Sequence, residues 1–101
     1  MNTELITQEL EQARRAQAAG NAGKARVCAR RAAGWTLRAI SGLTGDAIKQ
    51  LKWLRDNPSA PEAVRAAAMR LTTKVGHDHA LPFPDDPLVD AQTIITFVNS
   101  A

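Results

Sequence analysis

Apolar residues recur at helical spacing along most of the chain. Near the start, Ile6, Leu10 and Ala13 lie three or four residues apart, as on a helix that buries one narrow face. The sequence Gly-Asn-Ala-Gly at 20–23 then favours a stop, because glycine adopts the left-handed backbone that ends many helices. So short a connection predicts that the next helix packs antiparallel to the first.

The second predicted helix, residues 23–43, has one face of small residues and a back that is rich in arginine. At 100° per residue, an arc of about 160° collects the residues expected to be buried. These are Ala25, Cys28, Ala29, Ala32, Ala33, Trp35, Thr36, Ala39, Ile40 and Leu43. The back carries Arg26, Arg30, Arg31 and Arg38, joined by Val27 and Leu37. We expect this helix to lie at the centre of the fold.

Three further helices follow. The sequence at 41–45 breaks the chain before a short third helix, which Thr44 or Asp46 caps and whose inner stripe is Ile48, Leu51 and Leu54. Ser-Ala-Pro-Glu at 59–62 has the form of a capping box and opens a fourth helix that is predicted to end at Gly76. After a proline-rich loop at 77–87, Asp86 and Pro87 are a cap and a first-turn proline for the last helix.

The pattern therefore predicts an all-α fold, an antiparallel up-and-down four-helix bundle with a short extra helix. No segment shows the two-residue alternation of a β-strand. A chain of 101 residues supports one modest core, so we expect a single domain over residues 1–101.

Charge is distributed unevenly along the chain. All 13 Lys and Arg residues lie between Arg14 and Lys74, where only Asp46, Asp56 and Glu62 oppose them, so this segment carries +10 and the flanks −7. The basic middle could contact nucleic acid or a nucleotide. Alternatively, the acidic ends could pack beside it and neutralise it within the fold. The sequence leaves both interpretations open.

Composition also bears on the compartment. The single cysteine, Cys28, excludes an internal disulfide, is typical of a reducing cytoplasm and is expected to be a small core residue. The first residues lack the basic and apolar regions of a signal peptide. No apolar run approaches the ~18 residues of a membrane span. We therefore expect a cytoplasmic protein.

Residues 25–40, ARVCARRAAGWTLRAI, resemble the second helix of HEPN domains, in which small residues precede Ala, Glu-Lys, Leu, Lys-Ala and an aliphatic residue. Arg31-Ala32-Ala33 and Leu37-Arg38-Ala39-Ile40 match that order, whereas Gly34-Trp35 stands where the family often has Glu-Lys. The likeness covers most of the chain in layout, but only this segment in detail.

The resemblance implies a helical bundle that is often a dimer, with one of two functions. Some members are non-catalytic modules that bind nucleotides or partner proteins. Others are metal-independent ribonucleases with an Arg, four to six residues and a His, commonly paired with a nucleotidyltransferase antitoxin. Arg70 and His77 have six residues between them, so the imidazole would move a proton while the guanidinium held phosphate charge. The alternative is a helix-end arginine and a loop histidine.

Two other groups of residues have side chains that bear on function. His77, Asp78 and His79, with Asp85 or Asp86, are metal-ligand types, but alternate residues of an extended segment point to opposite sides, so we expect a polar loop, no metal and no cofactor. Trp35 is expected at the edge of the core. A homodimer interface is predicted from Trp53, Val27 and Leu37, because tryptophan is enriched in interface hot spots.

The sequence thus predicts a non-enzymatic HEPN-like binding module, cytoplasmic and homodimeric, with nucleotide or RNA contacts from Arg26, Arg30, Arg31 and Arg38. The alternative is an HEPN-type ribonuclease that uses Arg70 and His77 and pairs with a nucleotidyltransferase. A third interpretation is a structural subunit whose charge is neutralised internally.

Overall fold

Every regular element that the structure describes is an α-helix. The structure is a computed structural model, and it describes residues 3–73 and 86–100. The five helices in these ranges are α1 (Thr3–Ala18), α2 (Ala22–Ser41), α3 (Ala47–Arg55), α4 (Glu62–Thr72) and α5 (Pro87–Asn99). The prediction of an all-α fold is therefore confirmed over the described ranges.

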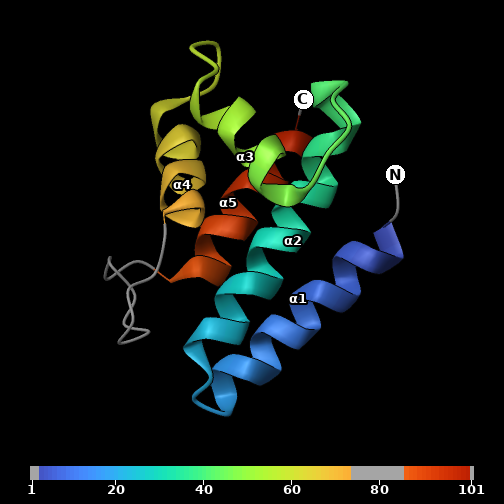
Figure 1. Ribbon diagram of the computed structural model, residues 1–101, viewed down its shortest axis with the longest axis vertical. Coiled ribbons are helices and arrows are strands. Elements are labelled where there is room, and N and C mark those ends of the chain that lie inside the picture. The colour runs from blue at the N-terminus through green and yellow to red at the C-terminus, as the bar shows by residue number, and fades with distance from the viewer. Residues whose placement is uncertain (1–2, 74–85, 101) are drawn as a thin grey trace.

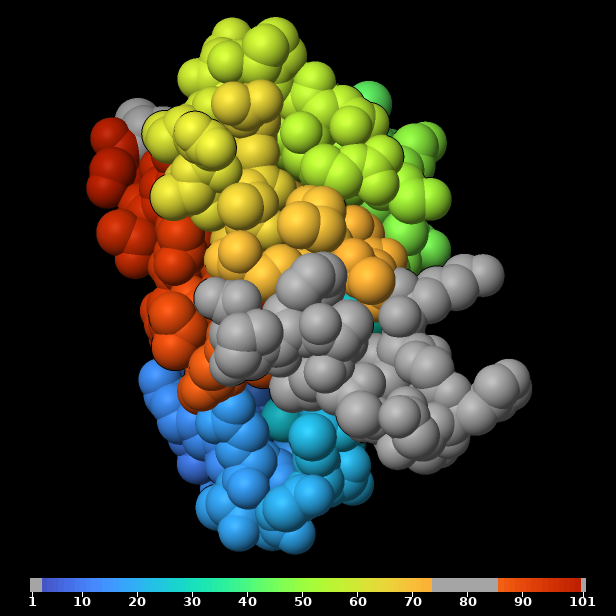
Figure 2. Space-filling view, turned by 90° about the vertical axis from the view of Figure 1, so that its left-hand side faces the viewer, coloured from blue at the N-terminus to red at the C-terminus, as the bar shows by residue number. Residues whose placement is uncertain are grey.

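Helix α2 lies at the centre, as predicted. It packs against α1, α3 and α5, and α4 completes the fold by packing against α3 and α5 (Figure 1). Figure 2 shows α4 and α5 side by side on one face of the molecule. The side of α2 that meets these helices is built largely from alanine: Ala25, Ala29, Ala32 and Ala33 are at most 2% exposed. Because interaxial distance depends on the side chains at the contact, these small residues let several helices approach α2 closely.

The main core lies among α2, α3, α4 and α5. Its largest fully buried side chains are Leu37, Leu51, Leu54, Leu71 and Ile94. Each such side chain contributes roughly 1.5–3 kcal/mol relative to an exposed one. A smaller cluster of Ile6, Ala32 and Ile95, with Leu10 and Trp35 packed against it, joins α1 to α2 and α5.

The predicted buried arc of α2 is wrong near the end of the helix. Leu37, expected on the polar back, is fully buried, whereas Ala39 and Ile40, expected in the core, are exposed. Helix α3 packs on the side that carries Gly34, where an added Cβ would lie 2.5 Å from the Cβ of Ala47. A helical projection assumes one buried side throughout, but the neighbours of α2 change along its length.

The predicted helix ends were correct in part. Asp46 caps α3 by accepting a hydrogen bond from the amide of Lys49, and Asp86 caps α5 in the same way through Leu88. The capping box at 59–62 is wrong: the cap residue of α4 is Pro61, which makes no side-chain cap bond, and the amide of Ser59 donates to Asn57 instead. No helix in the described ranges is both long and apolar enough to cross a bilayer.

Candidate anion-binding site

Two of the four arginines on the predicted back of α2 point into the fold. Arg26 is only 2% exposed, and its Nη2 donates to the backbone carbonyl of Arg70 at 2.7 Å and to that of Thr73. Arg30 Nε donates to the carbonyl of Leu71 at 3.0 Å. These carbonyls belong to the end of α4, where unpaired C=O groups carry partial negative charge that cations stabilise. Arg26 and Arg30 therefore cap α4.

Two sequence predictions about these residues are wrong. Arg26 and Arg30 do not lie on an exposed back, and α4 ends at Thr72, before the predicted end at Gly76. The carbonyls of Arg70 and Leu71 accept hydrogen bonds from Arg26 and Arg30, so α2 supplies donors to the end of α4. Burial, followed by the positive charge of Arg30, lowers the pKa of the Arg26 guanidinium, and Asp90 acts in the opposite direction.

Arg70 forms a two-pronged ion pair with Asp90 of α5. Its Nε lies 3.0 Å from Oδ2 and its Nη2 lies 2.8 Å from Oδ1, and Asp90 is 4% exposed. Such charge-assisted pairs are among the stronger polar contacts in proteins, so this pair stabilises the packing of α4 against α5. His77, the other half of the predicted ribonuclease site, lies outside the described residues, as do Asp78, His79 and Asp85.

The other two arginines, Arg31 and Arg38, are exposed. The guanidinium carbon of Arg38 lies 4.5 Å from the centroid of the Trp35 ring, and its Nη2 donates to the carbonyl of Gly45 at 2.7 Å. Trp35 in turn packs against the small cluster around Ile6. Because a guanidinium over an indole face is held by a cation–π contact, Arg38 is oriented although it is open to solvent.

Arg31 and Arg38 open onto a shared hollow of about 210 Å³. It is lined by Arg31, Gly34, Trp35, Arg38, Gly45, Asp46 and Ala47. Arg31 also meets Glu9 of α1 at 3.8 Å, a pair that leaves more than half of the arginine exposed and that contributes about 0–1 kcal/mol. The two guanidinium groups are seven residues apart, which is roughly two turns of helix. This arrangement offers two cations to one bound anionic molecule.

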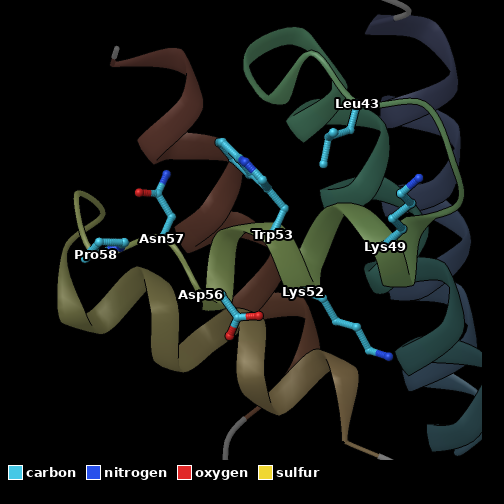
Figure 3. A pocket seen from close by; sticks show the side chains of 7 residues that line it. All are labelled: Leu43, Lys49, Lys52, Trp53, Asp56, Asn57 and Pro58. Carbon is cyan, nitrogen blue, oxygen red and sulfur yellow. The ribbon is translucent and has the colours of Figure 1, made fainter.

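A second, larger hollow of about 570 Å³ lies beside α3. It is lined by Leu43, Lys49, Lys52, Trp53, Asp56, Asn57 and Pro58. Figure 3 shows the indole of Trp53 extending toward the side where Leu43 lies, while Lys52 and Asp56 extend to the opposite side. Trp53 is half-buried against the main core, as predicted for a residue beside the inner stripe of α3.

The three residues predicted to form a dimer interface do not share one surface. Val27 is 37% exposed and Trp53 is half-buried, but Leu37 is fully buried in the main core. Leu37 therefore cannot meet a partner across the surface of the folded chain. The error has the same origin as the misplaced arc of α2.

One important side chain was missed at the sequence level. Gln50 is fully buried, its Nε2 donates to the carbonyl of Leu43 at 2.8 Å, and its Oε1 accepts from the hydroxyl of Ser41 at 2.5 Å. Gln50 of α3 thereby holds the end of α2 and the segment that follows it in place. Its spacing of four residues from Leu54 places it at the edge of the inner stripe of α3, which is the signal that could have found it.

Nothing in the described ranges gathers three metal-ligating side chains of the His, Cys, Asp or Glu type. Comparison of the chain with protein-family models, with curated proteins and with solved structures found no match.

Proposed function

We propose that this protein is a non-enzymatic, HEPN-like binding module that contacts a nucleotide or RNA through Arg31 and Arg38. In this proposal α1, α2, α4 and α5 are an antiparallel four-helix bundle, and α3 is the short extra helix. The observation that carries the proposal is the fixed position of Arg38, which Trp35 and Gly45 orient while it remains exposed.

The geometry of Arg38 suits phosphate and base contacts. A guanidinium carries five N–H donors in a planar fork, and only Nη2 is used on Gly45. RNA-binding proteins use such planes to stack on unpaired bases, so a Trp35–Arg38–base stack is the expected contact. Because the side chain is already ordered, binding loses less rotamer entropy than it would with a free arginine.

A binding measurement with a matched control tests the proposal. The probe is a fluorescent single-stranded oligouridylate, titrated with the protein at low and at moderate salt. Loss of two phosphate contacts should reduce the slope of log affinity against log salt by about 1.4 for a single strand. We expect the double variant Arg31→Ala/Arg38→Ala to show this reduction and to bind at least tenfold more weakly.

The control is Arg14→Ala/Arg15→Ala, which removes the same charge from an exposed part of α1. Equal weakening in both double variants, or no binding by the wild type at low salt, would dispose of the proposal. Cleavage of the probe that disappears in Arg70→Ala and His77→Ala would replace it with the ribonuclease alternative and its nucleotidyltransferase partner.

The proposed module is a homodimer, with Val27 as the remaining candidate for its interface, because Leu37 is buried and Trp53 lines the hollow beside α3. Light scattering at micromolar concentration tests this separately from RNA binding. A dimeric mass that falls to the monomer in Val27→Asp, but not in Met69→Asp, is the expected result. Met69 is the matched control because it is 39% exposed on α4. A monomeric wild type would remove the dimer from the proposal.

A further inference from the structure

We propose that the ligand is single-stranded RNA, bound along a track that runs from Arg31 and Arg38 on α2 to Lys49, Lys52 and Trp53 on α3. This inference rests on the proposed function and extends it. It assigns a role to the hollow beside α3, names one class of nucleic acid, and predicts a binding site several nucleotides long.

The two hollows adjoin at Gly45. Arg38 donates to the Gly45 carbonyl, and the side chain of Lys49 packs against the same residue, so that an added Cβ at Gly45 would lie 2.6 Å from Lys49 Cδ. Gly45 lines the first hollow and Lys49 lines the second. The two hollows are therefore neighbours across the α2–α3 connection, and cations line both of them.

The hollow beside α3 combines an aromatic side chain with two lysines. The half-buried indole of Trp53 extends toward the side where Leu43 lies, and Lys49 and Lys52 also line this hollow, with Lys52 leaving α3 on the side opposite the indole (Figure 3). Asp56, the acidic residue of the hollow, is paired with Arg55 at 3.0 Å, so its charge is offset locally. A positive row with interleaved aromatic side chains is how proteins hold single strands, with bases stacked on the rings and phosphates on the cations.

Duplex nucleic acid does not fit this track. In a duplex the bases are stacked on one another, so they cannot reach an indole or a guanidinium plane. A flexible single strand can fill both hollows, because its bases turn outward independently.

The two tryptophans give a direct test, because the chain has no tyrosine and no further tryptophan. In Trp53→Phe the remaining indole, Trp35, reports on the first hollow; in Trp35→Phe the remaining Trp53 reports on the second. Each variant is titrated with an oligouridylate of about 12 nucleotides, within the site sizes of known single-strand binders. We expect both reporters to change their emission with the same dissociation constant.

The outcomes separate this inference from the function on which it rests. A response from Trp35 with none from Trp53 overturns the track and leaves the α2 site standing. If neither Trp35 nor Trp53 changes its emission at low salt, both the track and the α2 site are wrong. Equally tight binding of duplex RNA, or of polyglutamate, also overturns the track, since neither can stack bases on the indole.

A charge-matched pair of variants adds a second measurement. Lys49→Ala/Lys52→Ala should weaken binding of the 12-nucleotide probe about tenfold and reduce the salt slope by about 1.4. The control, Arg14→Ala/Lys24→Ala, removes two exposed cations away from both hollows and should have a smaller effect. Equal weakening in the two double variants would show a general charge effect and overturn the track.

Discussion

Arg30 and Arg31 are neighbours in the sequence but have opposite roles in the fold. Arg30 joins Arg26 in donating to the end of α4, whereas Arg31 joins Arg38 beside an open hollow. Successive residues of an α-helix are rotated by 100° about its axis, so one side chain can face a neighbouring helix while the next faces solvent. A row of arginines on a helix is therefore not one functional unit. Each arginine takes its role from whatever backbone or solvent lies beside it.

The largest expected effect is a loss of stability from a change at the buried ion pair between α4 and α5. Asp90→Ala removes the buried carboxylate that pairs with Arg70 across the contact between α4 and α5. Loss of one member of a buried pair costs about 3–5 kcal/mol, so urea unfolding should show a decrease of this order. Glu11→Ala, which loses only exposed pairs on α1, is the control and should change stability by less than about 1 kcal/mol. Similar values for the two variants would mean that the Arg70–Asp90 pair is not structural.

The second prediction compares a buried arginine of α2 with an exposed one. Arg26→Met removes a charged donor from two α4 carbonyls and should lower the free energy of unfolding by about 2–3 kcal/mol. Arg31→Met should change it by less than about 0.5 kcal/mol, because Arg31 is exposed. RNA affinity should show the reverse order, with the larger loss in Arg31→Met. The comparison fails if both variants are equally stable.

The third prediction concerns the contact that places α3. In Gly34→Ala the new Cβ would lie 2.6 Å from the Cα of Ala47, so α3 must shift, at a cost of about 1–3 kcal/mol. The shift would also move Gly45 away from Arg38 and weaken RNA binding. Gly23→Ala is the control: its only contact within 4 Å would be the Asn21 side chain at 3.9 Å, and it should gain about 0.5–1 kcal/mol. Thermal unfolding of the two variants measures the difference.

The smallest effect is expected at Cys28. Burial, followed by the nearby carboxylate of Glu9, raises the pKa of this thiol, while Arg31 lowers it. Since the folded-state pKa lies above the unfolded one, the stabilising contribution is complete below the ordinary thiol pKa of about 8.5 and is lost as pH rises toward the folded value. The stability difference between wild type and Cys28→Ala should therefore decrease from pH 8 to pH 10. A constant difference across this range would contradict the prediction.

Features that depend on neighbouring residues in the sequence could be predicted. The glycine turn after α1, the Asp46 cap and the Asp86–Pro87 start of α5 are local, because each needs only its own backbone and the next few amides. The alanine-rich face of α2 could also be predicted, because the spacing of its alanines is read directly from the sequence.

Features that depend on distant residues could not be predicted. Nothing near Arg26 in the sequence shows that the end of α4, more than forty residues away, lies beside it. The side-chain donors at the end of α4 likewise come from α2, which the sequence near residue 72 does not show. The candidate site was accordingly half correct in position: Arg31 and Arg38 are exposed as predicted, and Arg26 and Arg30 are not.

Gln50 has a kinetic consequence for any ligand that binds across the α2–α3 connection. Its two hydrogen bonds hold the connection in place before a ligand arrives, so no loop has to close during association. Diffusion and charge should then set the association rate constant, which should fall as salt rises, while the dissociation rate constant changes little. Gln50→Leu, which leaves the Leu43 carbonyl without its donor, should slow association at every salt concentration.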